Sequence, residues 1–485
     1  MPAPTTSGTP HPTRPPAPPT PSQQPRGADG GAVLRSSFGD DVFLRRHRGL
    51  AAPVHNQLAW RYDAALAPAA VEALVDALAT GGLARRVDRA LVPAARDRWS
   101  AADHRPAVQH TDALPPGEAL AWLRRHGSVP LDPTTGRGWS VATASLTDGG
   151  SLLSLVVSHA VADGGAMVDA ATRAGERSAP LVLPPRPALL PALAGDVRDA
   201  AGQVAEVLRW GLARLPRGGG SRSSAPAPAP AAMPTPSRPD APGASPTANP
   251  GVDWTTPLAV AEVSAVEVAD VAARHGGTPN TWFVALVAGV AARLRGTDAP
   301  IPVALPVATR EPGDLRANAT RIARASISPA PSADPAVPED PAALDLTAVR
   351  AACKDAYRRL AQAAAAAEPV PLALVQMLPD AVVGRLPQPP VAAALASNVG
   401  ELPDGFVRAA GLPARSVTAI AHQVGAGAAE VRASGGGVAA WMCTTGGRAT
   451  VSFAGMDPDR VADDEALAAA VLAELDRWGV RAERW

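Results

Sequence analysis

The chain has 485 residues, of which 46% are hydrophobic, and its 45 Lys and Arg residues balance 45 Asp and Glu residues. This length is enough for two domains of ordinary size, each with its own core. Because no basic excess exists to neutralise phosphates, the composition argues against nucleic acid as a partner.

Cys353 and Cys443 are the only cysteines, which excludes a disulfide framework and a four-thiolate zinc site. We expect no bound metal and, without a Walker loop or a GxGxxG turn after a strand, no bound nucleotide cofactor. The N-terminal segment lacks the apolar core of a secretory signal, and no apolar run approaches the roughly 18 to 20 residues of a membrane span. We therefore expect a cytoplasmic protein, soluble or peripheral at the inner face of the membrane.

Prolines and glycines, 53 and 43 in number, are clustered in segments that cannot form a core. Residues 1–40 are predicted to be a disordered Pro-rich arm, and residues 216–252 a linker rich in Pro, Ala and Ser. The linker lies near the midpoint of the chain. It divides the remainder into an N-terminal lobe, 41–215, and a C-terminal lobe, 253–485.

The first lobe is predicted to mix strands and helices. Hydrophobic periodicity and turn signals predict strands at 57–62, 139–146 and 151–158, and helices at 68–79 and 118–126. The last two strands are joined by an Asp-Gly turn. A mixed sheet of this kind tends to place ligand sites at the ends of its strands.

Residues 196–215 are predicted to form an amphipathic helix, with Val197, Val204, Leu208 and Leu212 along one side. Such a helix can lie on a lipid surface, so it is the best place in the sequence to look for membrane contact. The alternative is an ordinary helix on the surface of the domain.

The second lobe begins with a predicted strand at 257–262. Helices are expected at 265–275, 280–295, 345–367 and 464–478, the last capped by Asp464, and strands at 391–398, 438–444 and 449–454. Residues 328–345 form a predicted loop rich in Pro and Asp.

The most informative stretch is 151–170, which reads SLLSLVVSHAVADGGAMVDA. A buried strand delivers His159 to its carboxyl end, and Asp163, Gly164 and Gly165 lead into a helix. An imidazole held in such a loop accepts a proton near neutral pH when a partner fixes its tautomer. The two glycines allow backbone or ligand to approach closely.

The segment from His159 to Gly164 matches the HxxxDG signature of the chloramphenicol-acetyltransferase-like acyltransferase superfamily. Four further stretches resemble its bacterial wax ester synthase/diacylglycerol acyltransferase branch: 131–139, 277–281, 301–310 with Asn318, and 397–400. The resemblance covers about residues 56–478. The family often carries two adjacent histidines at the motif, and here the first position is Ser158.

The resemblance implies an α/β fold of two chloramphenicol-acetyltransferase-like lobes, each a mixed sheet with helices, around an active-site channel. It implies that His159 is the general base and that Asp163 pairs with an arginine that orients the loop. Arg85, Arg86 and Arg310 are the candidate partners. The alternative for Asp163 is a plain helix N-cap.

A transfer reaction of this kind also needs a donor for the developing oxyanion. Ser397, Asn398 and Gly400 are candidates to supply or shape that pocket, although Asn398 fits a strand-ending turn equally well. Ser158 is expected to hydrogen-bond the loop backbone, and the absence of a GxSxG elbow argues against its being a nucleophile.

The implied activity is O-acyl transfer, of a fatty acyl group, from the co-substrate acyl-CoA to an alcohol or glycerolipid acceptor. Two alternatives remain open. One is condensation or polyketide-associated chemistry, in which the donor is a thioester of an acyl carrier protein and the acceptor is an alcohol or amine. The other is a non-catalytic scaffold whose Pro-rich segments bind partners.

Overall fold

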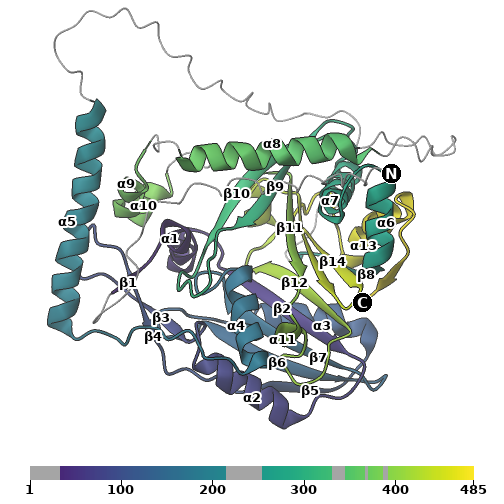
Figure 1. Cartoon of the computed structure of the whole chain (residues 1–485), viewed down its shortest axis with the longest axis horizontal. Coiled ribbons are helices and arrows are strands. Elements are labelled where there is room, and N and C mark those ends of the chain that lie inside the picture. The colour runs from purple at the N-terminus through teal and green to yellow at the C-terminus, as the bar shows by residue number, and fades with distance from the viewer. Residues whose placement is uncertain (1–32, 215–253, 330–344, 366–369, 386–391) are drawn as a thin grey trace, which may run out of the picture.

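The computed structural model describes residues 33–214, 254–329, 345–365, 370–385 and 392–485. The predicted linker, most of the predicted arm and most of the 328–345 loop lie outside these ranges. Two large sheets dominate the described part, one in each half of the molecule (Figure 1). The mixed α/β fold with two lobes is confirmed.

The first sheet has five strands in the order β12-β2-β7-β6-β5, with bounds Ser416–Gln423, Val54–Tyr62, Ser151–Ser158, Trp139–Leu146 and Gln109–Leu114. Strand β7 is hydrogen-bonded to an antiparallel neighbour on each side, and all of its residues are buried. Helices α2 (Pro68–Ala79), α4 (Gly164–Glu176) and α11 (Asp404–Val407) share a hydrophobic core with one face of this sheet, while the turn η2 (Pro116–Glu118) and helix α3 (Ala119–Gly127) lie at the other. Burial on both faces explains why β7 reads as a continuous apolar run.

The second sheet has seven strands in the order β10-β9-β11-β13-β14-β8-β15, with bounds Thr320–Ile327, Ile301–Ala308, Ala394–Glu401, Val438–Thr445, Arg448–Gly455, Leu258–Ser264 and Ala482–Arg484. Its core is shared with α6 (Ala265–Arg274), α7 (Pro279–Arg295), α8 (Leu346–Ala365) and α13 (Asp464–Arg477). Helix α7 begins with a capping box between Thr278 and Thr281. A smaller core joins the lobes, in which Ala59 and Leu152 pack with Leu258 and Val260.

The two halves of the sequence do not correspond to the two sheets of the fold, because one strand of the second half lies in the first sheet. Strand β12 belongs to the second half of the sequence but pairs with β2 over eight residues and completes the first sheet. Phe406 of α11 packs in the same core as Trp60. The predicted boundary of the second lobe therefore needs correction, since residues 402–423 return to the first.

The predicted arm ends earlier than residue 40. Residues Leu34–Arg35 form β1, which pairs with β4 (Arg98–Ala101) beside β3 (Arg85–Asp88), and Phe38–Arg45 form helix α1. Ser37 and Asp40 form a capping box at the start of α1. The Asp40 carboxylate also accepts a hydrogen bond from Trp99, so tertiary contacts hold this segment in place. The short π-helix η1 (Arg46–Leu50) follows α1 directly.

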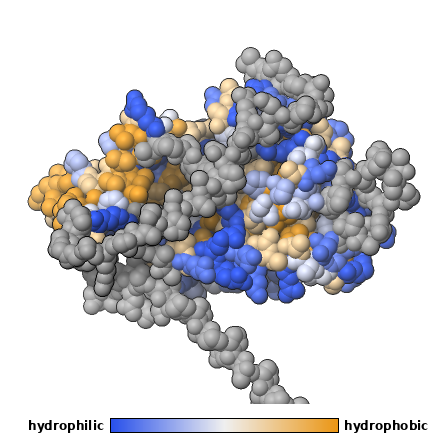
Figure 2. All heavy atoms as spheres, turned by 90° about the horizontal axis from the view of Figure 1, so that it is seen from above, coloured by the Kyte–Doolittle hydropathy of each residue, from blue (hydrophilic) through white to orange (hydrophobic). Residues whose placement is uncertain are grey.

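The amphipathic helix is longer than predicted. Helix α5 spans Leu189–Arg214, and Asp196 lies fully buried between Arg35 and Arg98. Its exposed apolar side chains are Leu189, Leu190, Leu193, Val197, Val204, Leu208 and Leu212. Figure 2 shows hydrophobic surface gathered at the end of the molecule where α5 lies.

Most other predicted elements are confirmed, and α2, β6 and β7 have the predicted bounds. One correction concerns the last helix, because Asp463 is the residue that caps α13. Asp464 instead accepts hydrogen bonds from Arg124 of α3 and from the backbone N–H of Leu258, and so joins the two lobes. Three short helices complete the described chain: α9 (Leu372–Met377), α10 (Asp380–Val383) and α12 (Ala428–Ala433). Along the described residues, no helix combines the length and apolarity needed to cross a bilayer.

Candidate functional site

His159 follows β7 directly, and its backbone N–H bonds to the Val54 carbonyl at 2.8 Å. The half-buried imidazole stacks on the ring of Phe43 with centroids 3.6 Å apart. Its Nδ1 lies 3.0 Å from Oδ1 of Asn318, which sits just before β10 in the other half of the chain. Because an amide oxygen can only accept, Nδ1 carries the proton and Nε2 is left as the acceptor.

Asn318 is itself fixed in orientation. Its Nδ2 donates to Oδ1 of Asp40 at 3.1 Å and to the carbonyl of His159 at 3.0 Å. Its backbone N–H donates to the same Asp40 oxygen at 2.8 Å. These donors require the amide nitrogen on one side, so the amide oxygen must face the histidine. The buried Asp40 thus sets the tautomer of His159 through Asn318.

The surroundings of His159 favour its neutral form. Burial lowers the pKa of this imidazole below its ordinary value near 6.5, although the charge of Asp163 and the bond to Asn318 act in the opposite direction. A neutral imidazole with an acceptor Nε2 is the form that can take a proton from an incoming O–H or N–H group.

The Asp163 carboxylate accepts four hydrogen bonds, which hold the loop in place. Its Oδ1 accepts from Arg310 at 2.9 Å and from the N–H of Ala166 at 2.8 Å, and its Oδ2 accepts from the N–H of Ala319 at 2.7 Å and from the hydroxyl of Thr320 at 3.0 Å. Burial alone acts to raise the pKa of Asp163, but Arg310 and these donors hold it below the usual value. The two alternatives drawn from the sequence are therefore both realised, since Asp163 caps α4 and also forms the ion pair.

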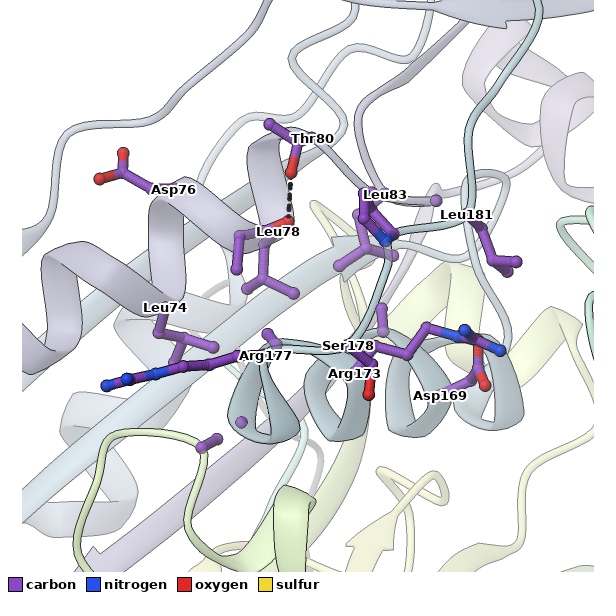
Figure 3. A pocket seen from close by; sticks show the side chains of 18 of the residues that line it. Leu74, Asp76, Leu78, Thr80, Leu83, Asp169, Arg173, Arg177, Ser178 and Leu181 are labelled. Atoms are coloured by element: carbon purple, nitrogen blue, oxygen red, sulfur yellow. Dashed lines mark hydrogen bonds and ion pairs between the residues drawn. The ribbon is translucent and has the colours of Figure 1, made fainter.

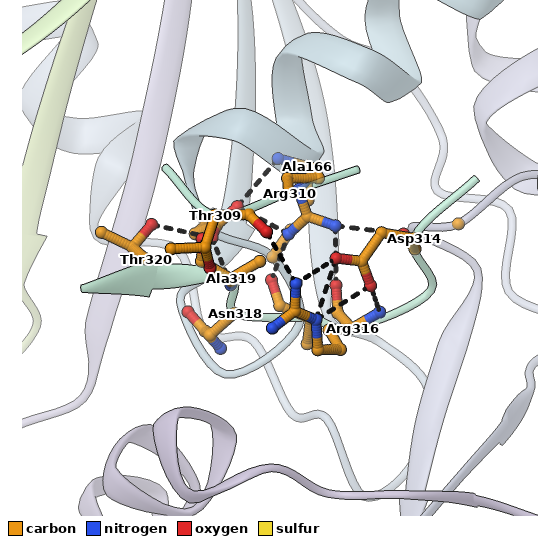
Figure 4. A network of polar contacts seen from close by, with 12 residues as sticks. Ala166, Thr309, Arg310, Asp314, Arg316, Asn318, Ala319 and Thr320 are labelled. Carbon is orange, nitrogen blue, oxygen red and sulfur yellow. Dashed lines mark hydrogen bonds and ion pairs between the residues drawn. The ribbon is translucent and has the colours of Figure 1, made fainter. Parts of the chain in front are cut away.

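Arg310 is the arginine partner, and Arg85 and Arg86 are not. Its guanidinium also donates to the carbonyls of Asp314, Arg316 and Ala317, which ties the 310–319 loop to the histidine loop (Figure 4). Arg86 pairs with Asp88 instead, at 3.3 Å. The segment that carries Arg310 and Asn318 thus bonds to both His159 and Asp163 from the opposite half of the chain.

The two glycines of the loop differ in their surroundings. A Cβ added to Gly164 would meet no atom within 4 Å, so this position leaves open space beside the loop. A Cβ added to Gly165 would lie 3.6 Å from Nε of Arg310. The space at Gly164 agrees with close approach of a ligand.

Ser158 bonds the loop backbone as expected, accepting from the N–H of Ala160 at 3.3 Å. Its hydroxyl also lies 2.6 Å from Nε2 of His47, a contact that the sequence did not indicate. A second imidazole therefore lies beside the position where relatives of the predicted family carry their first histidine. It comes from η1 and not from the motif.

Ser397, Asn398 and Gly400 lie on β11, at a break in its register with β13. Asn398 donates to Oδ1 of Asn280 at 3.0 Å and accepts from the N–H of Gly400 at 2.9 Å. Gly400 has a φ of 85°, which a side chain would disfavour. These bonds fit the strand-ending turn, and no described contact joins the three residues to His159, so their oxyanion role stays a prediction.

Sequence reasoning did not assign roles to Phe43, Asp40 or Asn318. Asn318 lay within a segment of family resemblance, which was a usable signal for its position. No signal in the sequence pointed to Phe43 or Asp40, because α1 is short and reaches the site only through tertiary packing.

The sequence matches no protein-family model and no curated protein. Solved structures do match along most of the chain. The first condensation domain of the CDA synthetase has a TM-score of 0.52 at 16% identity, covering 92% of this chain and 96% of that one. The condensation domain of the monacolin K polyketide synthase MokA has 0.51 at 12% identity, with the same coverages.

A third match is the wax ester synthase/diacylglycerol acyltransferase of Marinobacter aquaeolei VT8, with 15% identity over 92% of this chain and 100% of that one. Its TM-score of 0.49 is too low to support the branch predicted from the sequence. At these identities the likenesses establish the fold alone. The chain therefore has the two-lobed, chloramphenicol-acetyltransferase-like fold of condensation domains.

Proposed function

We propose that this protein is an acyltransferase in which His159 is the general base. The observation that carries the proposal is the Asp40–Asn318–His159 chain of hydrogen bonds, which presents Nε2 as an acceptor at the end of β7. An alcohol or amine acceptor gives its proton to Nε2 and attacks the carbonyl of an acyl thioester. The tetrahedral intermediate then expels the thiolate, which takes the proton back from the imidazolium and leaves as a thiol.

Two donors fit this chemistry. The motifs of the sequence favour free acyl-CoA with an alcohol or glycerolipid acceptor, while the likeness in fold to condensation domains favours a thioester on an acyl carrier protein. Ser397, Asn398 and Gly400 remain the proposed oxyanion pocket. Both donors use His159 in the same role, so the base does not distinguish them.

The test supplies the purified protein with mixed acyl-CoAs or with acylated carrier protein, each with a panel of alcohols and amines, and identifies products by mass spectrometry. Turnover of free acyl-CoA without a carrier supports the first donor. Turnover only with the carrier supports the second. No transfer over the whole panel, together with specific binding of a partner protein, would overturn the enzymatic proposal in favour of a scaffold.

Contact with a lipid surface through α5 is part of this proposal. The side chains of Leu190 and Leu212 are 76% and 66% exposed on the same face of the helix. Arg198 and Arg209 are exposed beside this face, against one exposed acid, Glu206. An apolar stripe flanked by arginines suits an anionic bilayer surface.

Replacing both Leu208 and Leu212 by Glu is expected to weaken vesicle binding at least tenfold, because it puts charge into the exposed apolar face that would contact the lipid. Co-sedimentation with vesicles of phosphatidylcholine and 30% phosphatidylglycerol measures the effect. Ala213→Glu, exposed on the polar side of the same helix, is the matched control. Equal binding by all three proteins, or no binding by the wild type, counts against lipid contact through α5.

A further inference from the structure

A cavity of about 460 Å³ lies between α2 and α4, and the segments around Leu83 and Leu181 also line it (Figure 3). Most of its wall is apolar, from Ala73, Leu74, Ala77, Leu78, Ala166, Ala170 and Ala174 of the two helices. The volume lies within the usual range for small-molecule sites, about 300 to 1,000 Å³. Arg310 and Ala166 border it, whereas His159 does not line it.

Arg85 is the buried charge of this wall. Its side chain is held in one orientation, with Nε donating to the carbonyl of Gly82 at 2.6 Å and Nη1 to the carbonyl of Leu315 at 2.9 Å. The remaining nitrogen, Nη2, has no hydrogen-bond partner among the described residues. A Cβ built on Gly82 would lie 3.6 Å from Nη2 and 3.9 Å from Leu181 Cβ, and both residues belong to the wall. Arg85 is thus one of the residues that line the cavity, and Nη2 is the nitrogen of its guanidinium that the described chain leaves without a hydrogen bond.

No carboxylate of the described chain forms an ion pair with Arg85, although the residue is only 3% exposed. The acids in the cavity wall are engaged elsewhere, in the pairs Asp76–Arg105, Asp169–Arg173 and Asp314–Arg316. Burial lowers the pKa of Arg85 to about 10, so its surroundings penalise the cation. The charges of Asp40, Asp163 and Asp314 favour the cation, but none of these carboxylates lies close enough to form an ion pair with it. A buried guanidinium with a free N–H and no ion pair is stabilised further by an anion that enters the cavity.

We propose that the α2–α4 cavity binds an amphiphilic monocarboxylate, with its carboxylate on Arg85 and its apolar chain between the two helices. An inorganic oxyanion would satisfy Nη2 but would leave the apolar wall unfilled. A neutral alcohol would fill the wall but leave the charge without a partner. The site is distinct from the proposed base, and it adjoins Arg310, which braces the His159 loop.

Calorimetric titration of the full chain with octanoate, octanol and inorganic phosphate tests this proposal. We expect saturable binding of octanoate at one site, and at least tenfold weaker binding of each of the other two compounds. Equal affinity for octanol, equal affinity for phosphate, or no octanoate binding would each overturn the proposed ligand class.

Two variants locate the binding. Arg85→Met removes the charge, and Ala77→Phe fills the apolar part while leaving Arg85 intact, so each is expected to weaken octanoate binding at least tenfold. Ala69→Phe, on the exposed side of α2, is the matched control, and circular dichroism checks that every variant is folded. His159→Ala is expected to bind octanoate like the wild type. Loss of binding in His159→Ala, with Ala77→Phe unaffected, would place octanoate in the acyl-transfer site and overturn the proposal.

Discussion

Replacing His159 by Ala is expected to lower the rate of acyl transfer by roughly 10² to 10⁴, the usual contribution of a positioned general base. The side chain is half-buried and makes its described contacts to Phe43 and Asn318, so its loss removes the proton acceptor without opening a large core cavity. Single-turnover assays with the donor found active for the wild type measure the effect. His110→Ala, on the exposed strand β5, is the matched control.

Asn318→Ala sharpens this test. Asn318 is a positioning residue, since it fixes the Nδ1 proton of His159 and is not expected to touch the substrate. Its removal should lower kcat by roughly tenfold or more with little change in KM, because the imidazole can then adopt the wrong tautomer.

Near wild-type transfer by folded His159→Ala would contradict the assignment of the base.

The pH dependence of the rate follows from the lowered pKa of His159. The basic form is the neutral imidazole, so the rate should rise with pH through a midpoint below 6.5 and then remain level through neutral pH. A midpoint above 7 would contradict the lowered pKa, and would mean either that the imidazole is stabilised as a cation or that another group is the base.

Lowering the pH from 7.5 to 5 is expected to reduce the free energy of unfolding markedly, because three buried histidines resist protonation. Burial lowers the pKa of His55 and His126 to about 4 and that of His422 to about 3. In the unfolded chain these groups take up protons near pH 6.5. Stability is therefore complete above pH 6.5 and falls with decreasing pH, by up to about 1.4 kcal/mol per pH unit for each histidine.

His126 and His422 belong to one polar network beside β7, and His55 lies opposite His422 in the pairing of β2 with β12. His422 Nε2 donates to the side-chain oxygen of Gln57 at 2.7 Å, and Gln57 donates to Ser154 of β7 at 2.8 Å. His126 bonds to the same Ser154 hydroxyl at 2.8 Å, and His55 Nδ1 donates to the carbonyl of Gly127 at 3.1 Å. Protonating any of these three imidazole rings would place a positive charge in the buried interior, where no described acid pairs with it.

Urea unfolding monitored by tryptophan fluorescence at pH 7.5, 6.5, 5.5 and 5.0 measures this dependence. His126→Gln keeps a polar side chain but cannot titrate, so its stability should fall less steeply with pH, by about 1.4 kcal/mol per unit at most. His110→Gln should follow the wild type. A slope in His126→Gln equal to that of the wild type would show that this ring does not carry the effect.

Local patterns in the sequence were strong enough to predict several elements exactly. The Asp-Gly turn between two apolar runs determined β6 and β7, and Pro68 with the i, i+3, i+4 spacing determined α2. The position of His159 at a strand end followed from the same reasoning. The start of α1 was missed, because the predicted arm was extended to residue 40 and so included the capping box of Ser37 and Asp40, although that segment contains no proline.

The partners within the site could not be predicted in the same way. Arg310 lies 147 residues from Asp163, and Asn318 lies 159 residues from His159 and 278 from Asp40. No periodicity relates such positions, so the sequence offered three arginines and could not choose among them. Strand β12 was not predicted, and its return to the first sheet could not be, because strand pairing depends on register across distant segments.

The sequence by itself determined which segments become strands and helices around the motif, and which imidazole stands at the end of β7. Hydrophobic spacing, turn residues and helix caps act over a few residues, so the elements that carry these signals strongly could be predicted from their own segments. Only the tertiary structure decided that Asn318 orients that imidazole, that Arg310 pairs with Asp163, and that Arg85 lines a cavity without an ion pair. Each of these depends on the burial of polar groups by distant parts of the chain, and burial exists only once the lobes have packed together.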